Sequence, residues 1–596
     1  MPTTLPRNHS QPADAPPTSA TPADETASAS LPTPADSSQA EIDAALSDLV
    51  HHARDWARLG IPERRAVLRE LRRDVLEAAP AWAEACRRAE GLPPTGAGEK
   101  WLSGPYMVAR NLRLLDASLA DIDRLGAPRP AGHPRRRADG RLAVPVFPAS
   151  TSDRLFYPGV EAEVWIEGEV APEDLADHQA GAYREPTAAA GGVALVLGAG
   201  NVSSIGPMDL LSKLFVENQV VALKMHPVNA FLGPIFAQAF GVLIDRGALR
   251  ILYGGADVGD LLCRHEAVDE IHVTGSDATV EAIVFGPGEE GRRNKAAGTR
   301  RNPKPISSEL GNVSPVIVVP GPWSPDDLDW QGENLASMLV NNAGFNCNAA
   351  RVLVQHAGWE HRDTLLDAVR HHLAATPTRR AYYPGAAERH ADFVAAHPDA
   401  ETFGEAGNGE LPWTLIADVS PQTDNEICFR REAFCGVIAE TALDAPSVEQ
   451  FLERAVDFCN QRLWGTLNAT ILVHPLSLAD RRVAAAFESA VARLRYGTVA
   501  VNCWAAVGYG LVSTPWGAYP GHTLDDIQSG TGFVHNTLML ENVEKAVVRA
   551  PFRMTPKPPW FASHRTVTDL ARSITEFESE PSPGRLPSVF WPALRA

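Results

Sequence analysis

Two reactive side chains in the middle of the 596-residue sequence have the chemistry needed to act on a carbonyl group. Glu309 lies in a Ser-Ser-Glu-Leu-Gly-Asn segment, and Cys347 follows 38 residues later in an Asn-Ala-Gly-Phe-Asn-Cys segment. A thiolate attacks electrophilic carbon atoms, and a carboxylate takes a proton from water. A lone cysteine is more often a small buried apolar residue, so the segments around this pair must decide its role.

Short apolar runs alternate with helical stretches from Gly191 onward, which predicts parallel strands joined by crossover helices. The predicted strands cover residues 193–197, 220–223, 251–253, 270–273 and 316–319. This rhythm is typical of a doubly wound, Rossmann-type nucleotide-binding domain. A second α/β series from residue 324 to about residue 500 predicts a further domain that carries Cys347. The fold class is therefore α/β.

The N-terminal part of the chain changes character twice. Residues 1–40 are almost entirely Pro, Ala, Ser, Thr and Asp, a composition that predicts a disordered tail. Residues 40–92 have apolar positions at a spacing of three to four and predict two or three amphipathic helices. Residues 126–150 favour an irregular connection, and the alternation over residues 162–170 predicts a protruding hairpin near 160–172.

The composition excludes several functional classes. Hydrophobic residues make up 44% and charged residues 21%, as in ordinary globular proteins. The net charge of -19 disfavours nucleic acid as a partner. Seven scattered cysteines without a Cys-x-x-Cys pair indicate a reducing compartment and no metal site. With no long apolar run and no recognisable targeting segment, we expect a cytoplasmic protein without a membrane span.

Several segments between about residues 53 and 521, in their order and spacing, resemble the aldehyde dehydrogenase superfamily. The residues that carry this resemblance are Gly-Ala-Gly-Asn201, Val-Ala-Leu-Lys224-Met-His226, Val-Thr-Gly275-Ser276, Ser-Glu309-Leu-Gly-Asn, Asn342 to Cys347 and Arg-Glu432-Ala-Phe434. The resemblance implies a Rossmann-type nucleotide-binding domain, an α/β thiol domain and a small β-element for oligomerisation. It also implies domain limits of 41–322, 323–520 and a C-terminal extension over 521–596.

The resemblance assigns a role to each of these segments. Cys347 would be the nucleophile, Glu309 the general base, and the Asn201 amide an oxyanion donor together with the Cys347 backbone N–H. The residues expected to bind NAD or NADP are Lys224, His226, Gly275, Ser276, Glu432 and Phe434. The expected reaction passes through a thiohemiacetal and a thioester to a carboxylic acid. In isolation, Lys224 would also fit a surface lysine and Asn201 a turn residue.

Three positions depart from the commonest pattern of the family. Phe345 follows Gly344 where glutamine is usual, and Gly200 replaces the tryptophan usual before Asn201. Pro227 lies where NAD-preferring relatives often carry a glutamate that binds the ribose 2′-hydroxyl. With no carboxylate there to repel a phosphate, and with His226 adjacent, the choice between NAD and NADP stays open.

Two other functions remain open at this point. Gly200-Asn201 is similar to the acyl-group reductases of the superfamily, so coenzyme A could replace water as the acyl acceptor, or the reaction could run from an acyl thioester to an aldehyde. Glu309 favours the hydrolytic reaction, because thiol-accepting relatives commonly lack this base. A catalytically silent scaffold of the same fold is the third reading, and the presence of Cys347, Glu309 and Asn201 disfavours it.

The substrate and the assembly are expectations from the resemblance and from residue type. Aromatic residues that could line an apolar entrance are Phe345, Trp504, Tyr509 and Trp516, which favours a long aliphatic or aromatic aldehyde, although all four could equally be core residues. The resemblance implies a homodimer or homotetramer formed by strand exchange, with residues 544–552 as the exchanged strand. The chain beyond Arg549 carries no assignable motif and could cover a subunit interface or the substrate tunnel.

Overall fold

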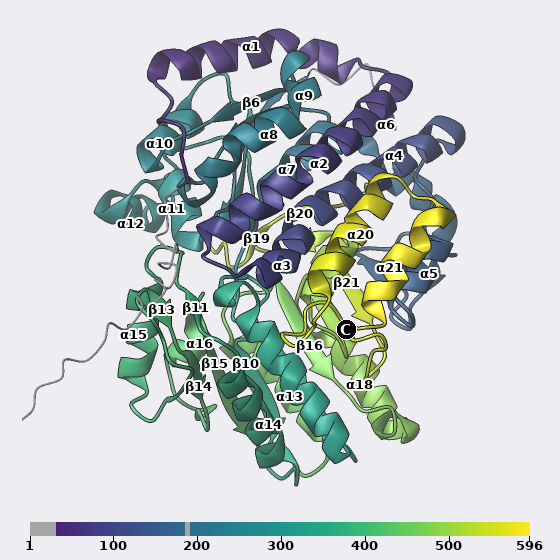
Figure 1. The fold of residues 1–596 in the computed structure, drawn as a ribbon, viewed down its shortest axis with the longest axis vertical. Coiled ribbons are helices and arrows are strands. Elements are labelled where there is room, and N and C mark those ends of the chain that lie inside the picture. Colours follow the sequence, from purple (N-terminus) through teal and green to yellow (C-terminus); the bar gives the residue numbers. More distant parts are fainter. Residues whose placement is uncertain (1–30, 185–190) are drawn as a thin grey trace, which may run out of the picture.

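The computed structural model of the protein describes residues 31–184 and 191–596. Most of the tail predicted over residues 1–40 lies outside this range, and residues 31–38 form neither helix nor strand. Two large sheets, each covered by helices, organise the described chain, with the smaller sheet in the upper half of Figure 1 and the larger sheet in the lower half.

The smaller sheet has the strand order β19-β8-β7-β4-β5-β6. Its strands are β4 (Val193–Leu197), β5 (Val220–Lys224), β6 (Leu249–Leu252), β7 (Glu270–Gly275), β8 (Ile306–Leu310) and β19 (Gly530–Thr531). All pair in parallel except β19, which is antiparallel to β8. The helices that follow these strands are α7 (Ile205–Phe215), α8 (Gly233–Ala239), α9 (Gly241–Asp245), α10 (Ala256–Arg264), α11 (Asp277–Phe285) and α12 (Gly288–Ala296). This is the doubly wound arrangement that the sequence predicted.

The larger sheet has the strand order β1-β2-β3-β21-β17-β16-β9-β10-β15-β14-β12. Its strands are β1 (Arg135–Arg136), β2 (Leu142–Phe147), β3 (Glu161–Ile166), β9 (Pro315–Val318), β10 (Val352–His356), β12 (Glu401–Phe403), β14 (Trp413–Ile416), β15 (Val437–Leu443), β16 (Asn468–Leu472), β17 (Thr498–Val501) and β21 (Val543–Arg549). The helices of this half are α13 (Pro325–Val340), α14 (Arg362–Ala375), α15 (Ala386–Ala396), α16 (Ile427–Arg430), α17 (Val448–Arg462), α18 (Arg481–Arg493) and α19 (Ala506–Leu511).

Two strand predictions need correction. The run at 316–319, expected in the nucleotide-binding sheet, belongs to β9, which pairs with β10 and β16 at the centre of the larger sheet. The hairpin expected near 160–172 is a single strand, β3, between β2 and β21. The stretch expected to be irregular also contains a strand, β2. The prediction missed this strand because the Pro- and Arg-rich residues before it masked the apolar run at residues 142–147.

Helices from both ends of the chain pack beside the two sheets. The N-terminal helices are α1 (Gln39–Ala57), α2 (Ile61–Ala89), α3 (Ala97–Trp101) and α4 (Met107–Leu125), and the C-terminal helices are α20 (Val567–Ser579) and α21 (Leu586–Ala593). In Figure 1, α20 (yellow) lies along α3 and α4, although more than 400 residues separate them in sequence, and α21 packs against α20. Among the described helices, none is both long and apolar enough to cross a membrane.

Short elements complete the described chain. They are the helices α5 (Thr151–Phe156) and α6 (Gly181–Arg184), the strand pairs β11 (Arg379–Arg380) with β13 (Glu410–Leu411) and β18 (Trp516–Gly517) with β20 (Phe533–Val534), and single turns that include η4 (Pro227–Leu232) and η5 (Asn341–Gly344).

Candidate functional site

The loop that carries Cys347 follows α13 through a run of left-handed residues. Asn342, Ala343 and Gly344 have φ values of 51°, 54° and 78°, so the chain turns sharply between α13 and Cys347. The Asn342 side chain holds this turn, because its Nδ2 donates to the Asn201 carbonyl at 2.9 Å and its Oδ1 accepts from Lys100 Nζ at 2.7 Å. Cys347 is the one cysteine that is not fully buried, and it lines a cavity.

Glu309 lies beside Cys347, although Glu309 belongs to the smaller sheet and Cys347 to a loop that leads into β10 of the larger sheet. It is the fourth residue of β8, it is 3% exposed, and its carboxyl is within hydrogen-bonding range of the Cys347 thiol. Trp516 Nε1 donates a second hydrogen bond to Glu309 Oε1 at 3.1 Å. The structure therefore brings the predicted nucleophile and base together.

Burial makes both groups of this pair favour their protonated forms. Desolvation and the nearby Asp209 raise the pKa of Glu309 to about 8. Desolvation and the carboxylates of Glu309 and Glu432 hold the pKa of the Cys347 thiol well above its usual range. At neutral pH the resting pair is a thiol next to a carboxylic acid, and the reactive form appears only when a proton leaves it.

Asn201 contacts the backbone of the cysteine loop. Its Nδ2 donates to the Phe345 carbonyl at 2.9 Å, and its own carbonyl accepts from Asn342 Nδ2 and from Tyr382 Oη. One of its two amide hydrogens is engaged in this way, and the other is left for a second acceptor. No described residue, apart from the sulfur of Cys347 itself, accepts from the Cys347 backbone N–H.

Parallel strands bring the predicted cofactor residues to one edge of the smaller sheet. Lys224 ends β5, Gly275 ends β7, and Ser276 caps the first turn of α11. Gly275 and Ser276 are exposed, and Lys224 donates to no acceptor within the described part of the chain. A helix N-terminus beside an unpaired ammonium group suits an anion such as a pyrophosphate.

Glu432 is the predicted residue from the other half of the molecule. Its Oε1 is buried without a hydrogen-bond partner in the described residues, and burial raises the pKa of this carboxyl to about 7. A Cβ atom added at Gly311 would lie 1.9 Å from Glu432 Oε2, so only glycine leaves room for this carboxylate. An unpartnered buried oxygen fits a ribose hydroxyl.

His226 and Phe434 belong to an aromatic cluster between the two halves. The His226 ring stacks on Tyr383 at 5.8 Å, and Tyr383 packs against Phe434 at 5.0 Å and Phe345 at 5.8 Å. A side chain at Gly200 would collide with His226, which accounts for the small residue there. Burial lowers the pKa of His226 to about 4, so its neutral ring adds no positive charge for a 2′-phosphate.

Lys224, the Ser276 helix start and Glu432 together fit a nicotinamide dinucleotide. They offer a cation, a set of backbone N–H groups and an acceptor for a ribose hydroxyl, respectively. Each unpaired group among these three residues thus has a matching group on the dinucleotide.

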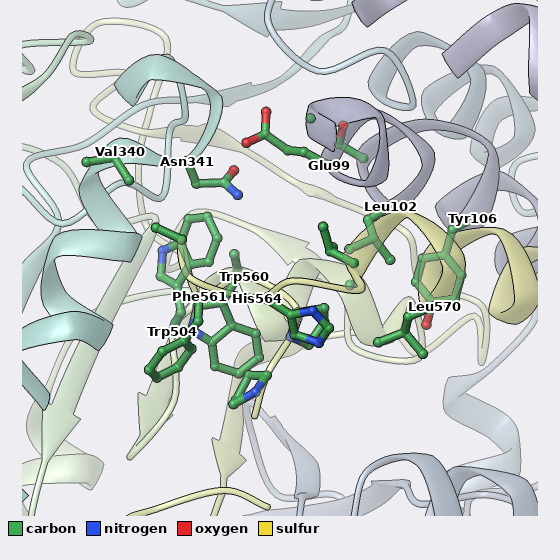
Figure 2. A pocket seen from close by; sticks show the side chains of 18 of the residues that line it. Glu99, Leu102, Tyr106, Val340, Asn341, Trp504, Trp560, Phe561, His564 and Leu570 are labelled. Carbon is green, nitrogen blue, oxygen red and sulfur yellow. The ribbon is translucent and has the colours of Figure 1, made fainter. Parts of the chain in front are cut away.

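A cavity of about 850 Å³ opens on the other side of Cys347. Trp504 and Tyr509 line it as predicted, whereas Trp516 and Phe345 are core residues that are 0% and 1% exposed. Figure 2 shows the cavity with Trp504, Trp560 and Phe561 on one side and Leu102, Tyr106 and Leu570 on the other. The sequence offered the stretch beyond Arg549 as a cover for the substrate tunnel or for a subunit interface, and Trp560, Phe561 and Leu570 of this stretch line the cavity. Which of its residues do so could not be predicted, because the stretch carries no motif.

Trp516 is the residue next to the reactive pair whose role sequence reasoning did not find. It lies 207 residues after Glu309 and reaches it because β18 and β20 pack against β8. Tyr509 supports the Trp516 ring at 5.6 Å and exchanges a hydrogen bond with Ser204 at 3.0 Å. The sequence around a tryptophan does not show whether its indole N–H donates to a carboxylate or whether the ring only packs in the core.

Comparisons with known proteins agree with this geometry. Residues 151–393 match the model of the Aldehyde dehydrogenase family. An aminoacetaldehyde dehydrogenase of Pseudomonas aeruginosa is 28% identical over 285 residues, which are 45% of this chain and 49% of that protein. The chain thus spans about half the length of this curated relative.

Solved structures extend the likeness to most of the fold. The NAD-dependent aldehyde dehydrogenase from Sinorhizobium meliloti has a TM-score of 0.57 at 18% identity, over 87% of this chain and 89% of that protein. The NADP-dependent glyceraldehyde-3-phosphate dehydrogenase from Bacillus halodurans, complexed with NADP, has a TM-score of 0.57 at 18% identity, over 86% and 92%. The chain therefore has the fold of these aldehyde dehydrogenase structures, and its residues 151–393 match the model of that family.

Proposed function

We propose that this protein oxidises an aldehyde to a carboxylic acid with NAD or NADP, through a covalent adduct on Cys347. The observation that carries the proposal is the contact between the Cys347 thiol and the Glu309 carboxyl at the inner end of a cavity. The family match of residues 151–393 and the names of the relatives support the same reaction class.

The first step uses Glu309 as the proton acceptor. As the Cys347 sulfur attacks the aldehyde carbon, its proton passes to the Glu309 carboxylate, and the carbonyl oxygen becomes an oxyanion. The Cys347 backbone N–H and the second amide hydrogen of Asn201 are the donors available to this oxyanion. Loss of one such donor typically raises the barrier by roughly 2.7–4 kcal/mol.

The second step releases the product from the thioester on Cys347. When bound, a nicotinamide would supply the oxidant that the chain lacks, as the acceptor of a hydride from the former aldehyde carbon. Glu309 first releases the proton of Cys347 to solvent and then takes a proton from water, the resulting hydroxide adds to the thioester carbon, and the sulfur leaves as thiolate. Trp516 favours the ionised form of Glu309, because its N–H donates to this carboxylate.

The cofactor residues support NAD or NADP equally. Lys224, Ser276 and Glu432 fit features that both dinucleotides share, and the neutral His226 adds no charge that would favour the 2′-phosphate of NADP. Pro227 lies at the position where a carboxylate would repel the 2′-phosphate of NADP, so NADP is not excluded there.

A coenzyme A-dependent reaction is the second candidate, favoured by Gly200 before Asn201. The test is absorbance at 340 nm with a panel of aldehydes and either NAD or NADP, with and without coenzyme A, on the wild-type protein and Cys347→Ala. We expect cysteine-dependent formation of the reduced cofactor without coenzyme A. Turnover that begins only with coenzyme A would support the second candidate, and no cysteine-dependent turnover under either condition would refute both.

A further inference from the structure

The last 46 residues of the chain, 551–596, form the outer side of the cavity that begins at Cys347. We call these residues the C-terminal wall. They lie outside the part of the chain that the family model matches, which is residues 151–393. Their contacts show how they are fixed and what they leave for a substrate.

One end of the C-terminal wall is anchored to α13, the helix that leads into the cysteine loop. Trp560 Nε1 donates to Asn334 Oδ1 at 3.0 Å, and the backbone N–H of Ala562 donates to Ser337 Oγ at 2.9 Å. Lys557 Nζ forms an ion pair with Glu333 at 3.0 Å. The wall is therefore tied to the helix that determines the position of Cys347.

The other end is anchored to the N-terminal helices. The Thr568 hydroxyl accepts from the Gly98 backbone N–H at 3.1 Å, and a Cβ atom at Gly98 would lie only 2.6 Å from the Thr568 nitrogen. Glu578 is buried and pairs with Arg110 at 2.7 Å and with Arg113 at 2.5 Å. A carboxylate this deep is stable only because two guanidinium groups compensate it. The wall thus bridges the two ends of the cavity rim as a fixed element.

The surface that the wall presents to the cavity is mainly apolar, although Lys557, His564 and Arg565 also line it. Its lining residues include Trp560, Phe561, Leu570, Ile574 and Val589. Trp504 lies beside Trp560 and Phe561 on one side of the cavity, and Leu102 and Tyr106 lie beside Leu570 on the other, so large apolar side chains bound the cavity on both sides (Figure 2). Such a surface favours occupants that bury apolar area over those that need hydrogen bonds.

The charged groups around the cavity compensate one another. Glu99 pairs with Arg379 at 2.8 Å, and Lys100 lies between Glu90 and Glu99 at 2.5 and 2.9 Å. His564 is 5% exposed, and its low pKa, caused mainly by burial, keeps the ring neutral. Glu410, the third carboxylate of the described lining, accepts from the Thr378 hydroxyl at 2.6 Å and from the Gly407 backbone N–H at 3.0 Å, so each lining carboxylate already has a partner within the chain.

We infer that the C-terminal wall makes the site selective for large, uncharged, apolar aldehydes, above all long-chain aliphatic ones. This inference rests on the proposed aldehyde oxidation. The volume of about 850 Å³ lies near the upper end of the range for small-molecule sites, roughly 300–1,000 Å³. A three-carbon aldehyde would leave most of it filled with water, whereas a chain of about ten carbons would contact the wall.

The first test is an aldehyde series from propanal to decanal. Each methylene buried against the cavity should raise kcat/KM by about fourfold until the chain passes the wall, so decanal should exceed propanal by at least about 100-fold. A flat or falling series, or a preference for 3-aminopropanal over decanal, would overturn the inference.

The second test places a bulky side chain on the wall. Leu570→Trp should reduce the decanal-to-propanal ratio at least about tenfold, because the indole occupies space that the long chain needs. Leu594→Trp makes the same substitution on the same segment at a position that is 69% exposed and outside the lining, and it should leave the ratio unchanged. Equal ratios in the two variants would contradict a role for the wall.

A binding measurement separates this inference from the proposed reaction. In Cys347→Ala, titration of the tryptophan fluorescence with decanal should show saturable binding at least about tenfold tighter than that of hexanal, and Leu570→Trp should weaken it. If decanal binds in this way but the wild-type protein reduces no cofactor with any aldehyde, the proposed reaction fails and the inference stands. If hexanal and decanal bind equally, the inference fails whatever the turnover.

Discussion

The Glu309 carboxyl raises the pKa of the Cys347 thiol, whereas the hydrogen bond from the thiol lowers the pKa of Glu309, which burial and Asp209 raise, so the pair offers the thiol proton an acceptor within the site. Burial alone would keep both groups protonated and unreactive, because each charged form loses its hydration. A contact between them gives the thiol a nearby acceptor, and the Trp516 N–H partly offsets the cost of charging Glu309. Reactivity should therefore follow the ionisation of Glu309.

Hydrolysis of p-nitrophenyl acetate by the cofactor-free protein isolates this ionisation. The reaction needs a thiol and a base but no hydride acceptor. Because the pKa of Glu309 is raised to about 8, its carboxylate fraction rises about tenfold from pH 7 to pH 9, and the cysteine-dependent rate should rise with it. Glu309→Gln should remove this rise, with Cys347→Ala as the blank. The same pH dependence in Glu309→Gln would exclude Glu309 as the group that titrates.

Trp516→Phe tests the hydrogen bond to Glu309. Removal of a donor to the carboxylate favours its protonated form, so the pKa should rise further and the alkaline limb should move to higher pH. A hydrogen bond to a charged group contributes roughly 1.5–3 kcal/mol, which predicts at least about a tenfold loss of the ester hydrolysis rate at pH 7. The rate at high pH should recover. An equal loss at every pH would indicate a packing defect instead.

Motifs around the reactive residues predicted the pair itself, because short segments fix which residue types follow a strand or precede a turn. They did not predict the engagement of Asn201 with the Phe345 carbonyl, which depends on how two halves of the chain meet. Trp516 was expected only as a residue of the apolar entrance or the core, and its contact with Glu309 arises from tertiary packing.

At the scale of elements, the carboxyl ends of β5 and β7 and the start of α11 place the predicted cofactor residues together. The alternation of strands and helices predicted this edge, since crossover connections have a fixed hand. The assignment of β9 to a sheet could not be predicted, because an apolar strand buried on both faces has the same pattern in either sheet. The sheet to which β2 and β3 belong could not be predicted either. β2 pairs with β3, and β3 joins the larger sheet through β21, which is about 380 residues away in sequence.

Gly311→Ala tests whether the position of Glu432 matters for the cofactor. The new Cβ atom would displace a carboxylate that lies within 1.9 Å of it, so we expect the Kd for the dinucleotide to rise at least about tenfold. Gly241→Ala is the matched control, because nothing lies within 4 Å of the added atom and Gly241 begins a helix. Calorimetric titration with NAD and with NADP measures the Kd of each variant. Unchanged affinity in Gly311→Ala would remove Glu432 from the cofactor site.

At the scale of the whole molecule, the C-terminal part of the chain completes the larger sheet and closes the cavity. β21 pairs in parallel with β17 and antiparallel with β3 of the same chain. Of residues 544–552, which were expected to cross to a partner, those up to Arg549 thus have a strand neighbour of the same chain on either side. A homodimer or homotetramer remains a prediction, and strand exchange is not needed to satisfy β21.

A disulfide between β17 and β21 tests this pairing in solution. Val501 and Arg549 are direct neighbours in the register, so Val501→Cys with Arg549→Cys should cross-link under mild oxidation. We expect a single-chain product on a non-reducing gel, with a mass 2 Da below that of the reduced protein. Arg549→Cys alone is the control. A covalent dimer that needs both substitutions would show that β21 is exchanged between subunits.

The central claim is that an acyl group is carried on Cys347 and that Glu309 removes it. The most direct measurement is peptide mass mapping of Glu309→Gln after acid quenching of a reaction with decanal and NAD or NADP. Because Glu309→Gln slows the attack of Cys347 as well as the hydrolysis of the thioester, the reaction is quenched after a series of increasing times. We predict an acyl adduct on the peptide that contains Cys347, formed together with reduced cofactor, that accumulates with time and approaches one per chain. An adduct on another residue, or turnover without any adduct on Cys347, would contradict the account.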